Sequence, residues 1–253
     1  MTCAATTDDI SAVATHYETL LAEHYTWMSG SFATKVAEQT ALLTRLGMSP
    51  QRSRHAVDLG CGPGFQSMAL ADLGYGVTAF DINRRLLAEL AQRRGQRPIV
   101  IQEADLRSFP SFLTHEVELI VCMGDTLPHL PSEDDVARLF RAVSRTLEPG
   151  GAFVLTYRDL SSELTGTDRF IPVRADQDRI MTCFLEYEAG TVVVHDLIHI
   201  RDGGEWTLRK SSYRKLRLPV RRVRDRLAEC GLIPCHEEMV KGMTVLVAGR
   251  PDR

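Results

Sequence analysis

The chain has 253 residues and a formal charge of −3, with 30 Lys and Arg against 33 Asp and Glu. Hydrophobic residues make up 44% and charged residues 25%, values typical of globular proteins, so extended disorder, collagen and coiled coil are excluded. No apolar run approaches the roughly 20 residues that span a bilayer, and the near-neutral charge argues against a dedicated nucleic-acid binder.

The N-terminal sequence and the cysteines indicate the compartment. The first nine residues lack the basic start and the apolar stretch of a secretory signal. The six cysteines are Cys3, Cys61, Cys122, Cys183, Cys230 and Cys235. They form no CxxC pair, so neither a disulfide framework nor a zinc site is expected. We therefore expect a reduced, cytoplasmic protein with no membrane partner.

Two helices are predicted at the start of the chain, over residues 9–24 and 31–46, the second beginning at Ser31 and ending at Gly47. Short apolar runs then alternate with amphipathic stretches. The runs predict strands over residues 55–59, 76–80, 98–102, 117–122 and 152–157, with helices over 65–73, 84–94 and 133–147. Such alternation is typical of a parallel, doubly wound sheet covered by helices on both faces.

After residue 157 the pattern changes to antiparallel hairpins, with extended segments over 178–187, 191–200 and 205–217. A helix over 219–230 and strands over 234–238 and 243–248 complete the first sheet. The sequence therefore predicts a Rossmann-like α/β fold with a mostly parallel seven-stranded sheet, a small antiparallel β insertion and an N-terminal helical cap. We divide it into a cap (1–50), a cofactor-binding core (51–158), an acceptor lid (159–217) and a C-terminal part of the core (218–253).

A glycine loop follows the first of these strands. Asp58-Leu59-Gly60-Cys61-Gly62-Pro63-Gly64 leads directly from the strand into a helix. Glycines allow a ligand to approach the backbone, and the helix N-terminus offers unpaired N–H groups. Asp81 ends the next strand, where a carboxylate can accept both hydroxyls of a ribose. We therefore expect a nucleoside-containing ligand at the carboxyl ends of these strands.

Two ligand classes compete for this loop. A dinucleotide motif requires G-x-G-x-x-G, whereas this chain has G-x-G-x-G preceded by Asp58 and interrupted by Pro63. An acid beside the loop would repel two phosphates and suits a cationic amino-acid tail better. No lysine motif of an ATP-binding loop is present. An NAD(P)-dependent oxidoreductase on the same fold remains the alternative.

Over residues 55–157 the chain resembles the class I S-adenosylmethionine (SAM)-dependent methyltransferases. The resemblance implies SAM as cofactor, S-adenosylhomocysteine as product and no metal. The implied cofactor-binding residues are Asp58, Gly60, Cys61, Gly62 and Gly64 of the loop, Asp81 and Ile82 for ribose and adenine, Ala104, Asp105 and Leu106 for the adenine amino group, and Cys122 and Met123 for the amino-acid end. Asp105 taken alone would be interpreted as a helix or turn cap. Tyr17 and Tyr25 are candidates to close over the cofactor, with a place in the core as the alternative.

Within that family, the segment from Val121 to Pro131 resembles glycine and related small-amine N-methyltransferases, although Asp125 stands where that branch has Asn. The resemblance implies a small-molecule acceptor, either an amine or an amino acid. Arg158 falls where that branch binds a substrate carboxylate. Another departure is the segment over residues 32–35, where the branch carries an arginine.

Methyl transfer from a sulfonium depends mainly on positioning the acceptor, assisted by a base that removes a proton. The candidate catalytic residues are His129 and Asp125 as bases, Arg158 as carboxylate clamp, and Tyr157 beside it. Packing is the alternative for His129, and an ion pair with Asp159 or Glu163 is the alternative for Arg158.

Two further features could carry function. His195 and His199 share one face of a predicted strand, where a structural role is favoured over a metal pair because no third ligand is evident. The basic stretch 209–226 is the one feature that favours RNA binding or modification. We expect it to be a solvated face, and the protein to be a monomer or a homodimer without nucleic acid.

Overall fold

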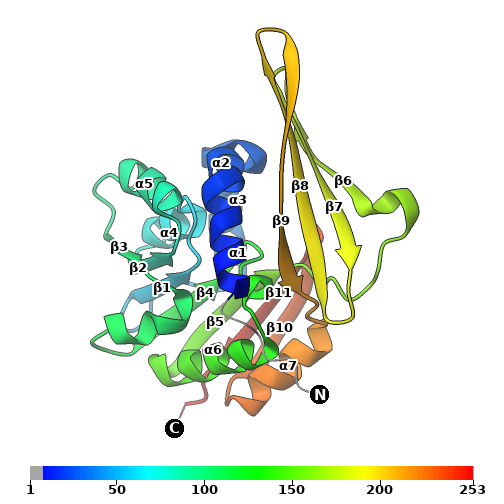
Figure 1. Ribbon diagram of the computed structural model, residues 1–253. Coiled ribbons are helices and arrows are strands. Elements are labelled where there is room, and N and C mark those ends of the chain that lie inside the picture. Colours follow the sequence, from blue (N-terminus) through cyan, green and yellow to red (C-terminus); the bar gives the residue numbers. More distant parts are fainter. Residues whose placement is uncertain (1–7, 253) are drawn as a thin grey trace.

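The computed structural model describes residues 8–252. Its main element is a seven-stranded sheet in the order β10-β11-β5-β4-β1-β2-β3 (Figure 1). The strands are β1 (His55–Leu59), β2 (Gly76–Asp81), β3 (Ile99–Glu103), β4 (Val117–Cys122), β5 (Leu147–Tyr157), β10 (Ile233–Val240) and β11 (Met243–Gly249). Only β11 runs against the others, since it is antiparallel to both of its neighbours. The mostly parallel seven-stranded α/β fold is thus confirmed.

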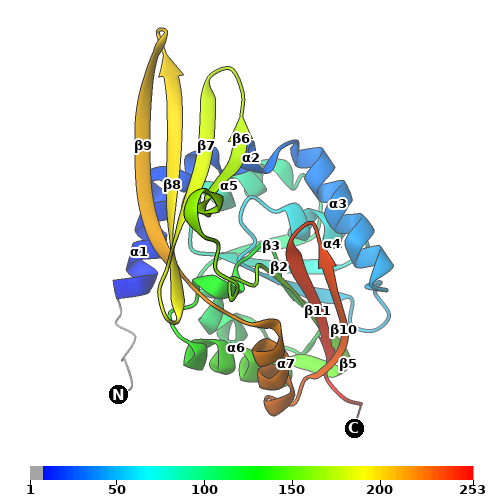
Figure 2. The ribbon, with the colours of Figure 1, turned by 90° about the vertical axis from the view of Figure 1, so that its right-hand side faces the viewer.

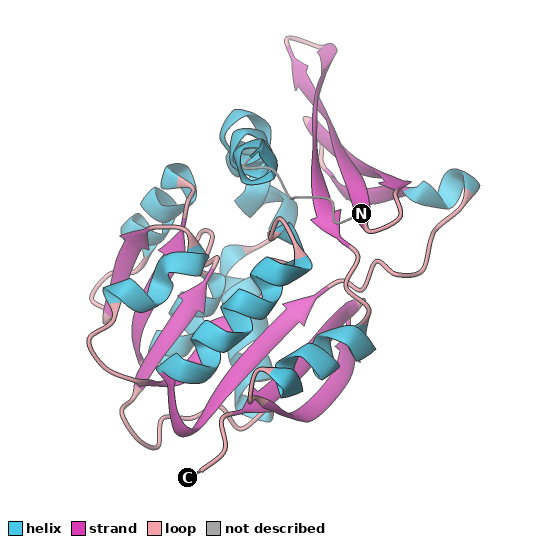
Figure 3. Ribbon diagram, turned by 60° about the horizontal axis from the view of Figure 1, so that its bottom comes forward, coloured by secondary structure: helices cyan, strands magenta, loops and turns pink. Residues whose placement is uncertain are grey.

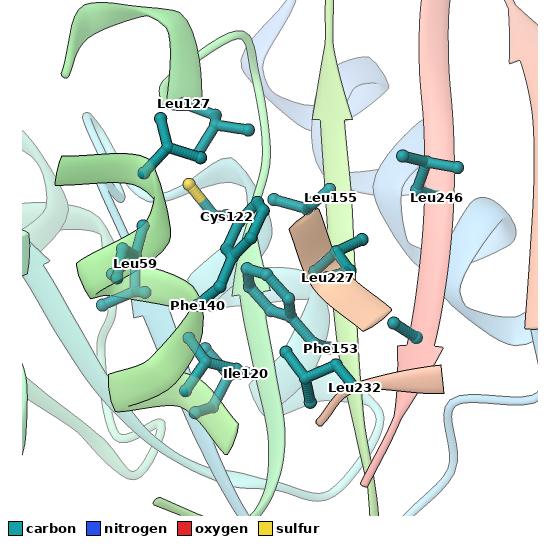
Figure 4. Close-up of a cluster of buried hydrophobic side chains, with 14 of the residues drawn as sticks. Leu59, Ile120, Cys122, Leu127, Phe140, Phe153, Leu155, Leu227, Leu232 and Leu246 are labelled. Carbon is teal, nitrogen blue, oxygen red and sulfur yellow. The ribbon is translucent and has the colours of Figure 1, made fainter. Parts of the chain in front are cut away.

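Helices cover both faces of this sheet (Figure 3). One face packs against α6 (Glu133–Thr146) and α7 (Val220–Glu229), in a cluster that includes Phe140, Phe153 and Leu227 (Figure 4). The other face packs against α3 (Phe32–Arg45), α4 (Phe65–Asp72) and α5 (Arg84–Arg93), through residues such as Leu43 and Leu90. Because both faces are buried, the central strands are continuously apolar, as the sequence indicated.

A second, antiparallel sheet stands beside the carboxyl ends of the first (Figure 2). It contains β6 (Phe170–Ala175), β7 (Arg179–Tyr187), β8 (Thr191–Asp202) and β9 (Glu205–Leu216) in that order. Its inner face packs against the N-terminal helices through Leu20, Leu21, Met181 and Ile198. The N-terminal cap therefore lies between the two sheets.

Several boundaries differ from those predicted. The first helix runs on to Ser29 as α1 (Asp8–His16), a π-helical turn (Tyr17–Leu21) and α2 (Ala22–Ser29). Strand β5 begins at Leu147, five residues before the predicted start, because the glycine pair at 150–151 lies within the strand. Strand β6 was not predicted, since all its residues are exposed and Pro172 interrupts the pattern.

Other expectations concern absences. No helix among the described residues is long and apolar enough to cross a membrane. The five described cysteines are all free thiols, in keeping with the expected lack of a disulfide framework. Cys3 and the first seven residues, on which the prediction about a secretory signal depends, lie outside the described residues.

Gly64, which precedes α4, has a φ of +98°, and a side chain there would collide with the buried Leu90. We expect Gly64→Ala to destabilise the fold by about 1–3 kcal/mol more than Gly47→Ala, because overpacking adds to backbone strain. Gly47 is the matched control: its φ is +76° but it has open space around it. Urea unfolding of both variants measures the difference, and equal losses would exclude the collision.

Candidate functional site

A pocket of about 830 Å³, partly open to solvent, lies at the carboxyl ends of β1, β2, β3 and β4. It combines the glycine loop, the ends of the next two strands and the N-terminal cap. Its lining includes Tyr17, Tyr25, Gly60, Gly62, Asp81, Ile82, Ala104, Asp105, Leu106 and His129. Ten of the residues singled out from the sequence thus surround one cavity, at the edge where open α/β sheets bind ligands.

Asp81 ties the glycine loop to β2. Its Oδ2 accepts the Gly62 N–H at 2.8 Å, and its Oδ1 accepts the Asn83 N–H at 2.8 Å. The N–H groups of Gly60 and Cys61 donate to the Phe80 carbonyl, which fixes the loop against the same strand. Burial raises the pKa of Asp81, although the N–H donors oppose this. The Asp81 carboxylate therefore stands at the pocket edge in a site built from backbone donors.

Asp58 lies beneath the loop and is not among the residues that line the pocket. It is buried, and its Oδ2 accepts the Ser67 hydroxyl of α4 at 2.5 Å. Burial raises the pKa of Asp58 to about 7. In this arrangement Asp58 holds the loop onto α4 instead of facing the cavity.

Four further residues from the cofactor set lie away from the cavity. Cys61 and Met123 are buried in the cluster that faces α3 to α5, and Cys122 is buried in the cluster on the other face. Gly64 supports the loop through its backbone conformation. None of these four residues is among those that line the pocket.

On the third side of the pocket, Asp105 caps the short 3₁₀ helix Leu106–Phe112. Its Oδ1 accepts the Arg107 N–H at 2.8 Å, and its Oδ2 accepts Arg107 Nη2 at 2.7 Å. Arg107 also pairs with Asp135 at 3.3 Å. Asp105 is therefore a helix cap, which was the alternative interpretation of its sequence position. It also lines the pocket.

Aromatic rings form the wall of the pocket opposite the strand ends. The ring centroids of Tyr17 and Tyr25 lie 6.0 Å apart, and the Tyr17 ring meets His129 edge-on at 5.8 Å. His129 stacks on Tyr213 of β9 at 5.2 Å with an interplanar angle of 9°. Tyr213 was not identified from the sequence, because nothing local links β9 to the loop after β4.

His129 is an uncharged imidazole at this wall. Burial, with a further contribution from Lys215, lowers the pKa of His129 to about 3. Its Nδ1 is buried without a hydrogen-bond partner. His129 is thus a weak base that contributes shape and a polar edge.

Asp125 is the centre of a buried charge cluster. Its Oδ2 accepts Lys215 Nζ of β9 at 2.5 Å and lies 3.3 Å from Arg158 Nη1, while its Oδ1 accepts the Arg158 N–H. Lys215 and Arg158 keep the pKa of Asp125 below its usual range, although burial opposes them. As an ion-paired carboxylate, Asp125 is a poor proton acceptor. Lys215 appeared in the sequence only as part of the basic stretch.

Arg158 forms an ion pair, as its alternative interpretation predicts, but the acid is neither Asp159 nor Glu163. Arg158 pairs with Asp125, whereas Asp159 accepts the N–H groups of Ser161 and Val220, and Glu163 pairs with Arg217. More than half of the Arg158 side chain is exposed. Its guanidinium therefore retains the capacity to bind a second anion.

Tyr157 points away from the pocket. It is fully buried in the apolar cluster with α7, and its hydroxyl has no hydrogen-bond partner. Successive residues of a strand face opposite sides, so Tyr157 enters the core while Arg158 follows at the strand end.

His195 and His199 lie on the outer face of the second sheet, where His195 pairs with Glu186. No cluster of three metal-ligating side chains occurs among residues 8–252.

Comparisons with known proteins agree with this arrangement. The family described as "Methyltransferase domain" matches residues 56–151. A putative methyltransferase of Bacillus subtilis (strain 168) is 27% identical, covering 72% of this chain and 74% of that protein. A cypemycin N-terminal methyltransferase of Streptomyces sp is 31% identical over 53% of this chain and 54% of its own length. Rat (Rattus norvegicus) glycine N-methyltransferase is 27% identical over 51% and 48%.

Among solved structures, the SAM-bound amino pentose methyltransferase CalS10 of Micromonospora echinaspora is similar in fold. Its TM-score is 0.74, covering 90% of this chain and 95% of that chain at 16% identity. The likeness extends over the cap and the second sheet as well as the core.

The charge state of His129 leads to a pH prediction. The pKa of His129 is about 3 in the folded chain and about 6.5 in the unfolded chain. Between these two pH values the folded chain therefore binds fewer protons than the unfolded chain. The stability contribution of His129 is therefore complete above about pH 6.5 and is lost as the pH falls towards 3. We expect its ring NMR shifts to stay constant from pH 8 to 5, and Lys215→Met to raise its pKa. A titration near pH 6.5 in the folded protein would contradict this account.

Proposed function

We propose that this chain, which is a class I SAM-dependent methyltransferase, transfers the methyl group to an amine nitrogen of a small molecule. Its relatives include methyltransferases whose names specify an amine: the N-terminus of cypemycin, glycine and an amino pentose. The observation that carries the proposal is the pocket itself, which is lined by the Asp81 carboxylate and by the rings of Tyr17, Tyr25 and the uncharged His129.

The pocket residues fit SAM. Asp81 would accept the ribose hydroxyls, Ile82 would pack against adenine, and Ala104, Asp105 and Leu106 would surround the adenine edge. Arg107, the cation among the lining residues, is already bound by Asp105 and Asp135. When bound, SAM supplies a methyl group on a sulfonium; transfer leaves the bonding electron pair on sulfur and the positive charge on the acceptor nitrogen.

The residues around the acceptor end favour catalysis by positioning. His129 is neutral and weakly basic, and Asp125 is neutralised, so neither is suited to remove a proton at pH 7. An amine that enters in its unprotonated form needs no such base. The chain's contribution is then to orient the nitrogen and exclude water, which can lower a barrier by about 7–11 kcal/mol.

Arg158 supports an acceptor that also carries a carboxylate. Lys215 and Arg158 share the single carboxylate of Asp125, which leaves one positive charge in excess. Arg158 is the more exposed of the two and offers the planar fork that binds carboxylates. We therefore propose an amino acid or a related zwitterionic amine as acceptor.

The alternatives have less support. For an oxidoreductase, the pocket would have to hold a pyrophosphate beside the Asp81 carboxylate. Arg107, the cation that lines the pocket, is already paired with Asp105. For RNA binding, the cations of the basic stretch would have to be free of ion pairs with the protein's own acids. Seven of its nine cations pair with acids: Arg209, Arg214, Lys215, Arg217, Arg222, Arg224 and Arg226. This pairing supports the interpretation as a solvated face, except for Lys215, which is buried with Asp125.

Asp81→Ala should weaken the binding of S-adenosylhomocysteine by about 1.5–3 kcal/mol, or about 10- to 150-fold, because it removes charged hydrogen bonds. Titration calorimetry measures this, with NADH as the competing ligand. Asp72→Ala is the control, since Asp72 pairs with Arg97 on the surface. Unchanged affinity in Asp81→Ala would remove Asp81 from the site, and binding of NADH alone would overturn the proposal.

Arg158→Ala should raise the KM of a carboxylate-bearing amine at least about tenfold and leave cofactor affinity unchanged. Initial rates are measured with sarcosine, which carries a carboxylate, and with N-methylethylamine, which does not. The KM should rise for sarcosine only. Arg222→Ala, which breaks a surface pair with Glu133, is the control. An equal effect on both amines would refute the clamp.

A further inference from the structure

We propose that the aromatic end of the pocket is a cation-binding subsite backed by the buried carboxylate of Asp196, which stabilises the positive charge that methyl transfer places on the acceptor nitrogen. This inference rests on the proposed function and defines the chemistry of its acceptor. The group recognised is the methylated ammonium, which forms when the unprotonated nitrogen accepts the methyl group.

The wall of the subsite consists of ring faces and edges. Tyr17, Tyr25 and His129 line the pocket, and Tyr213 stacks behind His129. Tyrosine rings attract cations through the negative potential of their faces, most strongly when the site is desolvated. His129 is uncharged and does not oppose a cation. The wall therefore offers a surface that prefers a positive charge over a neutral group of the same shape.

The π-helical turn at Tyr17–Leu21 brings two of these rings together. In a regular α-helix, residues eight positions apart point about 80° away from each other. A π turn takes up one extra residue, which reduces the angle between Tyr17 and Tyr25 to about 20°. Their centroids accordingly lie 6.0 Å apart on the same side of the helix. Turns of this kind often occur at functional sites.

Asp196 lies behind this wall on the inner face of β8. It is 1% exposed, its Oδ2 accepts His16 Nε2 at 2.9 Å, and its Oδ1 accepts the Cys183 thiol at 2.8 Å. Neither partner carries a permanent positive charge. The His16 ring in turn lies 4.3 Å from the ring of Tyr213. The carboxylate is thus coupled to the aromatic wall through one layer of side chains.

The other charged groups near the wall are Asp81 and the cluster of Asp125, Lys215 and Arg158, whose excess positive charge lies on the exposed Arg158. Lys215 Nζ lies 5.6 Å from the centroid of the Tyr213 ring. Asp125 is bound by Lys215 at 2.5 Å and by Arg158, whose exposed side chain is screened by water. Among residues 8–252, Asp196 forms its ion pair with His16. Burial, followed by Tyr25 and by the carboxylates of Asp81, Asp196 and Asp125, raises the pKa of Tyr17. A cation in the pocket would add a permanent positive charge near Asp196, whose partners are His16 and Cys183.

The test compares choline with 3,3-dimethylbutan-1-ol, which has the same shape without the charge. With the protein saturated with S-adenosylhomocysteine, we expect choline to bind at least about tenfold more tightly. Asp196→Asn keeps the size of the side chain and should reduce this ratio at least about threefold, with cofactor affinity unchanged. Glu186→Gln is the matched control, because Glu186 is a carboxylate on the outer face of the same sheet.

If Asp196→Asn does not fold, Tyr17→Leu provides the second variant, since it removes a ring from the wall and keeps the buried pair. Equal binding of the two probes, no detectable binding of either, or a ratio that survives both variants would overturn the inference. Failure to bind S-adenosylhomocysteine would instead overturn the proposed function. The two probes can then still be compared on the free protein, so the two failures are distinguishable.

Discussion

The site depends on one interaction, in which the carboxylate at the end of β2 accepts a backbone N–H from the loop after β1. Parallel strands bring these two ends side by side, and Asp81 fastens them through Gly62 and Asn83. The loop must turn through left-handed conformations at Gly60, Gly62 and Gly64 to reach this position. A ligand with a ribose would meet the same carboxylate. Asp81 therefore both shapes the loop and is suited to recognise the cofactor.

The acceptor end depends on contacts between segments far apart in the chain. Lys215 of β9 reaches Asp125 after β4, and His16 of α1 reaches Asp196 of β8. A third contact joins Trp27 of α2 to Asp176 in the turn between β6 and β7. Asp125 has a φ of 75°, a conformation that costs energy for a residue with a side chain and that persists because Lys215 and Arg158 hold it. These polar contacts, the first two of them buried, join the second sheet to the cap and to the core.

Much of this arrangement could be predicted from the sequence, where the signal is local. Continuous apolar runs predicted the central strands, and Ser31 and Ser132 cap their helices as expected. Asp81 and the glycine loop were recognised from their spacing. Tyr213, Lys215 and Asp196 were missed because their roles arise from contacts about 80 to 180 residues away. Tyr157 was grouped with Arg158 by proximity, but strand alternation directs it into the core.

The most direct test of the account is a crystal structure of the chain with S-adenosylhomocysteine and choline. The account predicts the ribose hydroxyls on Asp81, the adenine beside Ile82 and Leu106, and the choline nitrogen against Tyr17 and Tyr25. A nucleoside bound outside this pocket, with the Asp81 carboxylate engaged only by Gly62 and Asn83, would contradict it.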